Sequence, residues 1–209
     1  MVSNIHHHYV QSHTEIMTVN LNIPEDYRLE CIREINLLGD SMDSSTNIKG
    51  QMTTYQVWKE SKVFDPLIMK IFNFMYTEEV QSEGIPEQAR EKTLGLNSCW
   101  GGVYRKGNKT VEHIHVPNYL SFVYYLQSNP NEDAPLIFGS TTNNMKINPT
   151  NDLLVIFASH LSHHVPVQES ENERVILAGN LSIYDKVWFD NLTQEQFDIN
   201  NLFNHVKYK

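Results

Sequence analysis

The sequence predicts a mostly β protein, a sandwich or jelly roll, with helices confined to its N-terminal part. From about Leu94 onward, short runs of β-branched, aromatic and aliphatic residues are separated by turn signals such as Lys106-Gly107-Asn108. Before that point, apolar residues recur at helical spacing. Many short strands at this spacing favour a β-sandwich or jelly roll over repeated βαβ units.

The first element expected is a half-buried strand at residues 17–23, where apolar and polar side chains alternate. A helix then opens at Pro24 and ends at Gly39, and a loop follows as far as Gly50. A second strand is expected at residues 53–58. The helix is expected to bury one face, which is formed by Leu29, Ile32, Ile35 and Leu38.

A second helix is expected to begin at Asp65, which suits the N-cap position, with Pro66 in its first turn. Its apolar residues keep helical spacing throughout, so we assign them to packing rather than to a cofactor site. These residues are Phe64, Leu67, Ile68, Ile71, Phe72 and Met75.

The second part of the chain is expected to form the β core. Strands are predicted at residues 94–104, 119–127, 135–139, 153–158, 165–168 and 174–184. A short helix is predicted at residues 193–203. We therefore expect a single domain over residues 1–209, with an N-terminal strand and helical support (1–93), a β core (94–185) and a C-terminal extension (186–209).

Composition argues against several classes of protein. A chain of 209 residues with 40% apolar side chains can bury a core. The net charge of −9 argues against a nucleic-acid partner, because such proteins usually display a basic face. No stretch is long enough to span a membrane, and residues 1–13 lack the apolar segment of a secretory signal. Cys31 and Cys99 match no zinc or redox spacing, so we expect a reducing, cytoplasmic setting.

Two histidine clusters carry the strongest chemical signal. His113 and His115 belong to the run E-H-I-H-V, and His163 follows in the run S-H-L-S-H-H. In an extended segment, residues two apart point to the same side, so His113 and His115 can face one ion while Ile114 points away into packing. Three imidazoles can form the protein shell of a divalent transition metal.

Arg174 is the second chemical signal. It lies in the run E-R-V-I-L-A-G-N-L, whose apolar residues indicate an interior strand. A guanidinium in such a strand needs an anion to pair with. The alternative interpretations are a surface salt bridge of Arg174 with Glu171 or Glu173, and histidines that serve only as surface or core residues.

Five segments carry a family resemblance: residues 101–107 (GGVYRKG), 113–115 (HIH), 121–126 (SFVYYL), 156–163 (IFASHLSH) and 173–180 (ERVILAGN). In order and spacing they resemble the 2-oxoglutarate/iron(II) oxygenases. The resemblance is closest to a branch common in marine bacteria and phages, and it extends more loosely to prolyl 4-hydroxylases. It implies a double-stranded β-helix (jelly-roll, cupin-like) core, an Fe(II) ion, 2-oxoglutarate as co-substrate, and O2.

The resemblance also implies a role for each matching residue. His113 would be the first iron ligand and His163 the distal one. Arg174 would hold the distal carboxylate of 2-oxoglutarate. Tyr125 matches a tyrosine that hydrogen-bonds the same carboxylate in the prolyl hydroxylases, with simple core packing as the alternative. Tyr104 would contact the other end of the co-substrate.

The sequence departs from the wider superfamily at two positions. The superfamily has Asp or Glu where this chain has His115, so that two histidines and one carboxylate complete the facial triad. Here a three-histidine site and a shell completed by water both remain open. Ile176 stands where many members carry a hydroxyl for the co-substrate. His160 and His164, on either side of the distal ligand, are not expected to bind metal.

The implied activity is that of a dioxygenase (hydroxylase), which couples oxidative decarboxylation of 2-oxoglutarate to hydroxylation of a substrate. That substrate is a prolyl or other side chain of a protein or peptide, or a small molecule. A cupin-type metal-binding or isomerase domain is one rival, but the glutamate it requires is replaced by Tyr119 or Leu120. A non-catalytic β-sandwich interaction module with a structural zinc is another, and it would not need Arg174 to face the histidines.

Overall fold

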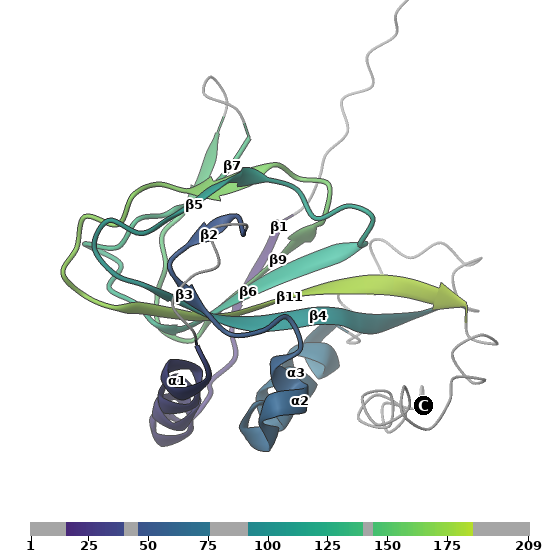
Figure 1. Ribbon diagram of the computed structural model, residues 1–209. Helices are drawn as coiled ribbons and strands as arrows, with labels where there is room; N and C mark the ends of the chain where they lie inside the picture. Colours follow the sequence, from purple (N-terminus) through teal and green to yellow (C-terminus); the bar gives the residue numbers. More distant parts are fainter. Residues whose placement is uncertain (1–15, 40–45, 76–91, 140–143, 186–209) are drawn as a thin grey trace, which may run out of the picture.

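The computed structural model describes residues 16–39, 46–75, 92–139 and 144–185. In these residues two antiparallel sheets face each other, and helices cover the outer face of the larger sheet (Figure 1). The protein is therefore mostly β with N-terminal helices, as predicted. The helix expected at residues 193–203 lies outside the described residues, and the division into support, core and extension stays a prediction.

The helical layer consists of α1 (Glu25–Leu38), α2 (Val57–Glu60), a 3-10 turn η1 (Lys62–Phe64) and α3 (Asp65–Met75). Both helices predicted from the sequence are present, and all six packing residues assigned to the second are buried. The N-cap prediction for Asp65 is wrong, because η1 runs directly into α3 and Ser61 caps the turn by accepting from the Val63 amide. None of the helices in the described ranges is long and apolar enough to cross a membrane.

The buried face of α1 matches the predicted one except at Leu29. Ile35 is fully buried and Ile32 and Leu38 are partly buried against the core, whereas Leu29 is 43% exposed. Cys31, which is also fully buried, extends the contact face in its place. Ile35 packs against β4 where Gly101 leaves room, since a Cβ on Gly101 would lie 2.5 Å from the Ile35 side chain.

The larger sheet has the strand order β1 (Ile16–Asn20), β9 (Leu153–Ala158), β6 (Leu120–Gln127), β11 (Arg174–Asp185), β4 (Lys92–Tyr104), β3 (Gln51–Met52). The smaller sheet has the order β2 (Ile48–Lys49), β5 (Lys109–His113), β10 (His163–Val165), β7 (Leu136–Phe138), β8 (Met145–Ile147). From β4 to β11 the chain crosses repeatedly between the sheets, and only β7 and β8 are consecutive in one of them. This winding is a double-stranded β-helix, or jelly roll.

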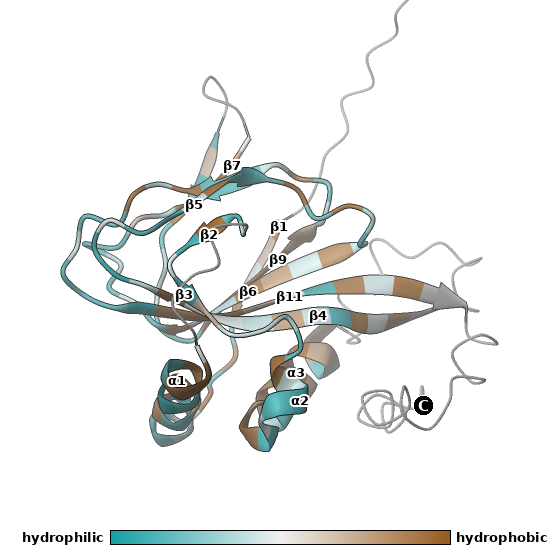
Figure 2. Cartoon of the chain, viewed as in Figure 1, coloured by the Kyte–Doolittle hydropathy of each residue, from teal (hydrophilic) through white to brown (hydrophobic). Residues whose placement is uncertain are grey.

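The strands of the larger sheet are buried on both faces and separate two cores. Tyr124 and Leu126 of β6 pack with the helices, whereas Tyr125 packs between the sheets. Because successive strand residues point to opposite faces, this alternation follows from the sequence. Figure 2 shows the resulting bands of different hydropathy along β6 and β11. The core between the sheets contains the cavity described below.

Two predicted strands are wrong, and other strands were not predicted. Residues 53–58 do not form a strand: α2 begins within them, and Val57 and Trp58 are both buried although they are adjacent. The strand expected at residues 165–168 lies earlier, as β10, and includes His163. Strands β5 and β8 are short and mostly exposed, so they lack the apolar alternation that marks a strand.

Gly179 on β11 is required by close packing, and Gly179→Ala is expected to destabilise the protein by about 1–3 kcal/mol. An added Cβ would lie 2.7 Å from the Phe122 ring and 2.8 Å from the Ser98 carbonyl oxygen. Gly102→Ala is the matched control, because its nearest contact is looser, 3.2 Å to the Ile176 side chain, and its three nearest atoms include no backbone atom. Urea unfolding measures the stability of both variants. Equal losses of stability would contradict the requirement for glycine at position 179.

Candidate metal and anion site

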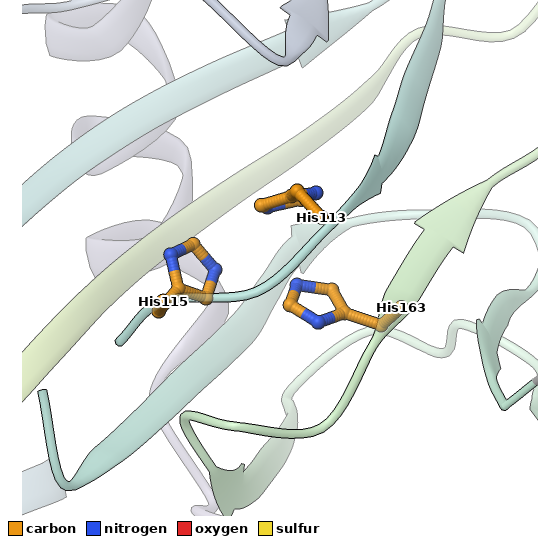
Figure 3. A group of neighbouring side chains, drawn as sticks. All are labelled: His113, His115 and His163. Carbon is orange, nitrogen blue, oxygen red and sulfur yellow. The ribbon is translucent and has the colours of Figure 1, made fainter. Parts of the chain in front are cut away.

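Three histidines meet at one end of the smaller sheet. His113 ends β5 and His163 begins β10, and the two residues are direct partners in the register of these antiparallel strands. His115 follows in the loop after β5. Their rings converge, as Figure 3 shows, and the ligand nitrogens all lie within 4.8 Å of one another. Nitrogens that each lie about 2.0–2.1 Å from one divalent ion are closer together than this limit, so the rings are gathered as potential ligands and would need to move closer to hold an ion.

Hydrogen bonds to the backbone fix two of the three rings. His113 Nδ1 lies 2.8 Å from the Val111 carbonyl oxygen, and His163 Nδ1 lies 2.9 Å from the Leu161 carbonyl oxygen. A carbonyl oxygen only accepts, so each Nδ1 carries the proton and each Nε2 keeps a free lone pair. This is the tautomer that binds a metal through Nε2, with the second nitrogen held by the protein.

The triad is neutral at physiological pH. Burial lowers the pKa of His113, and it lowers the pKa of His163 to about 4. The pKa of His115 falls to about 3, because of burial and because His113 and His163 lie beside it. All three nitrogen donors are therefore available to a cation without first losing a proton.

Acidification is expected to destabilise the metal-free protein. The ordinary pKa of histidine is about 6.5, and the folded values are lower, so below pH 6.5 the unfolded chain takes up protons that the folded chain does not. Stability is therefore complete above that pH and decreases as the pH falls towards the folded values. The melting temperature of metal-free protein between pH 7.5 and 5 measures this. The decrease in melting temperature should be smaller in His115→Leu. Identical pH profiles for the variant and the parent would contradict the lowered pKa of His115.

Arg174 lies in the same interior, at the start of β11. It is 1% exposed, and its Nη1 donates to the Ala134 carbonyl oxygen at 2.6 Å. The guanidinium carbon is 4.2 Å from the centre of the Tyr104 ring. Its Nε–H is buried without a hydrogen-bond partner, and it forms no ion pair within the described residues. A buried cation with a free donor is built to receive an anion.

The surface salt bridge considered for Arg174 does not form. Glu173 pairs with Arg105, and Glu171 pairs with Lys106. Instead, a buried hydrogen-bond network supports the backbone carbonyl to which the guanidinium donates. Gln168, which is fully buried, accepts from the Ala134 amide and donates to Asp133. The Ala134 carbonyl that holds Arg174 is thereby fixed in place.

Both tyrosines predicted for the site are buried beside Arg174. The Tyr104 hydroxyl is hydrogen-bonded to Thr110 at 2.7 Å, and burial raises its pKa. Burial also raises the pKa of Tyr125 to about 12, against the opposing effect of Arg174. Both phenols are therefore neutral and able to donate a hydrogen bond.

One cavity, open to solvent, brings these groups together. The three histidines, Arg174, Tyr104 and Tyr125 all line it. Its other walls are largely apolar and include Ile176. Arg174 thus shares a cavity with His113 and His163, which the rival structural-zinc sandwich does not require.

A second buried polar network positions the loop that carries His115. The His115 amide donates to the Ser159 carbonyl oxygen at 2.7 Å, and the Ser159 amide donates to the Tyr119 carbonyl oxygen at 3.0 Å. The Ser159 hydroxyl is bonded to that of Ser121, which also donates to Asn180. These residues, like Gln168 and Ala134, were not predicted, because isolated polar residues in apolar strands carry no sequence signal for such contacts.

His160, His164 and Ile114 lie next to the three clustered histidines in the sequence. His160 is exposed, and His164 belongs to no group of potential metal ligands in the described residues. Ile114 is not among the residues that line the cavity shared by the histidines, and it is 47% exposed rather than packed. The donor set is three imidazoles without a carboxylate. Imidazole suits iron, zinc, copper and nickel, so the triad fits a divalent transition metal.

Known structures share this fold. A prolyl-4-hydroxylase from Pseudomonas putida matches with a TM-score of 0.60 and 17% identity, covering 81% of this chain and 92% of that one. The viral collagen prolyl hydroxylase of Paramecium Bursaria Chlorella virus-1, solved with 2-oxoglutarate, matches at 0.59 and 13%, covering 79% and 94%. HygX from Streptomyces hygroscopicus, solved with nickel and 2-oxoglutarate, matches at 0.56 and 11%, covering 81% and 83%.

Comparison of the sequence alone finds no related family or protein. No protein-family model matches the chain, and no curated protein is significantly similar to it. At identities of 11–17%, the structural likeness establishes the architecture. The chain has the double-stranded β-helix fold of the solved prolyl hydroxylases.

Proposed function

We propose that this protein is a 2-oxoglutarate- and Fe(II)-dependent dioxygenase that hydroxylates a substrate C–H bond. One observation carries the proposal: a cluster of three histidines lines the same cavity as a buried arginine that has no anionic partner among the described residues. A metal site alone would fit many proteins. A metal site together with a buried anion site fits a co-substrate that chelates a metal through one end and carries a carboxylate at the other. The marine and phage branch of the family stays a prediction.

Each residue has a distinct role in this proposal. His113, His115 and His163 would hold Fe(II) through nitrogen lone pairs, so the site would have three histidine ligands. Arg174 would hold the distal carboxylate of 2-oxoglutarate, because the buried, planar guanidinium stays charged and donates in a fixed direction. Tyr125 would donate to that carboxylate.

The expected contact of Tyr104 with the other end of the co-substrate stays a prediction. The Tyr104 ring lies against the Arg174 guanidinium and its hydroxyl is bonded to Thr110. These contacts support a further role at the Arg174 end of the cavity. We propose that Tyr104 orients the guanidinium.

When bound together, Fe(II), 2-oxoglutarate and O2 supply oxidative decarboxylation to succinate and CO2 and transfer of an oxygen atom to the substrate. The chain itself orients the reactants and excludes water. Its apolar walls, such as Phe157 and Val165, would limit the access of water to the reacting atoms. The neutral triad binds metal without competition from protons near pH 7.

We propose a peptide or small-molecule substrate and no nucleic-acid partner, since the net charge is −9. A reducing, cytoplasmic location is supported by the two buried cysteines, Cys31 and Cys99, which are both free thiols. Burial raises the pKa of Cys31 to about 11, so this thiol is unreactive.

Turnover of 2-oxoglutarate tests the proposal. Purified protein, loaded anaerobically with Fe(II), should convert 2-oxoglutarate slowly to succinate once air is admitted, even without the substrate. Protein treated with a chelator, and protein loaded with zinc, are the controls and should yield none. A cupin-type metal protein or a structural-zinc module would neither bind nor consume 2-oxoglutarate, and that result would reject the proposal.

A further inference from the structure

His115 is held in place differently from the other two histidines of the triad. His113 and His163 each have a ring nitrogen hydrogen-bonded to a backbone carbonyl oxygen. The His115 ring forms no hydrogen bond with any residue that the structure describes. Its neighbours include the rings of His113 and His163, whose centres lie 4.7 and 5.0 Å away. The direction of the His115 nitrogens therefore depends on ring packing and on how firmly its backbone is held.

Hydrogen bonds hold the His115 backbone on both sides. The His115 amide donates to the Ser159 carbonyl oxygen at 2.7 Å. The His115 carbonyl oxygen accepts two hydrogen bonds from Asn118: one from its backbone amide at 3.0 Å, which closes a turn over residues 115–118, and one from its side-chain Nδ2 at 2.8 Å. Because a carbonyl oxygen only accepts, the nitrogen of the Asn118 side-chain amide faces His115. The side chain therefore adds a second restraint to the one that the turn itself provides.

The other end of the Asn118 side chain is anchored to the larger sheet. Its Oδ1 accepts from Asn97 Nδ2 on β4 at 2.8 Å and from Ser182 Oγ on β11 at 3.0 Å. At this point β4 and β11 are out of step: they pair residue for residue up to Asn180 and again from Leu181, and Asn97 is the extra residue of β4 between those pairs. An extra residue of this kind, a β-bulge, redirects a side chain. The irregularity of the sheet thus coincides with the anchor of Asn118.

We infer that Asn118 is a positioning residue for the metal centre, which sets the His115 imidazole as the third ligand by tying the His115 backbone to β4 and β11. The inference rests on the metal site of the proposed function, and Asn118 itself does not bind the ion. Residues that hold a metal ligand in place typically contribute about 10–100-fold in metal affinity. Since the turn keeps its backbone hydrogen bond without the side chain, we expect Asn118→Ala to weaken cobalt(II) about tenfold, at the lower end of that range.

Two measurements on Asn118→Ala test the inference. Calorimetric titration with cobalt(II) should show the loss of affinity. In zinc-loaded protein, NMR of isotope-labelled histidine nitrogens reports on each imidazole separately. The variant should lose much of the zinc-induced shift at His115 and keep the shifts at His113 and His163. An unchanged cobalt affinity would overturn the inference, and so would zinc-induced shifts that change equally, or not at all, at the three imidazoles, because a merely structural role spreads over the whole site.

Two further variants make the test specific. Asn36→Ala is the matched control, because the Asn36 Nδ2 also donates to a backbone carbonyl oxygen, that of Ile32 on α1 at 3.1 Å. The control should bind cobalt like the parent. The double variant Asn97→Ala/Ser182→Ala keeps the turn and removes both hydrogen bonds to the Asn118 oxygen, so it should also weaken cobalt, but by less. If Asn118→Ala does not fold, the double variant decides, and parental cobalt affinity in it would reject the inference.

Failure of this inference differs from failure of the proposed function. If the parent binds neither cobalt nor zinc, the metal centre of the proposed function fails, and the inference fails with it. If the parent binds cobalt through the three histidines and Asn118→Ala binds it as tightly, the positioning role is rejected and the proposed function stands.

Discussion

Replacing His163 with alanine is expected to abolish binding of a divalent transition metal. His163 is 4% exposed, and its Nδ1 is committed to the Leu161 carbonyl, so its Nε2 is a preoriented donor. Its ring lies 4.4 Å from that of His113 and 5.0 Å from that of His115, between centres. Without His163, the two imidazoles of His113 and His115 remain. Both come from one segment of the chain, and they are too few to hold the ion. Calorimetric titration with cobalt(II) measures the loss.

His160→Ala is the matched control for this loss, because His160 is an exposed histidine close by in the sequence. It should bind cobalt like the parent. His163→Gln keeps much of the side-chain volume, so it serves if the alanine variant folds poorly. If a folded His163 variant bound cobalt as tightly as the parent, the three histidines would not be the metal site.

Arg174→Ala is expected to weaken 2-oxoglutarate by about one to two powers of ten while metal affinity stays unchanged. A hydrogen bond to a charged group contributes about 1.5–3 kcal/mol, and the Arg174 guanidinium is the one formally charged group among the described residues that line the cavity. Its binding partner in the chain is a backbone carbonyl, so its removal does not disturb the histidines. Anaerobic titration of the cobalt protein with 2-oxoglutarate measures the effect.

Two further variants make this measurement specific. Arg105→Ala removes an exposed arginine that pairs with Glu173, and it should leave the affinity for 2-oxoglutarate unchanged. Arg174→Lys keeps the charge but loses the planar geometry, so its affinity should lie between those of parent and alanine variant. Equal affinity in Arg174→Ala and the parent would exclude the anion role.

The core of the fold could be predicted from the sequence because its signals are local. Strands β4, β6, β9 and β11 are apolar runs bounded by turn residues, and α3 has a regular apolar stripe. The histidine pair and Arg174 were recognised because metal ligands and buried cations are conspicuous in apolar strands. Their meeting in one cavity follows from the winding of the chain.

The contacts that position the site could not be predicted, because they depend on long-range pairing. His163 and His113 face each other through the register of β10 with β5, a short exposed strand without an apolar pattern. The support of Arg174 by Ala134 and Gln168 joins residues far apart in sequence.

A crystal structure of the protein with nickel(II) and 2-oxoglutarate tests the central claim most directly. The account predicts one metal ion bound to nitrogens of His113, His115 and His163. It also predicts that 2-oxoglutarate chelates that ion and places its distal carboxylate within hydrogen-bonding distance of Arg174. A metal on the triad with 2-oxoglutarate absent, or bound away from Arg174, would contradict the account.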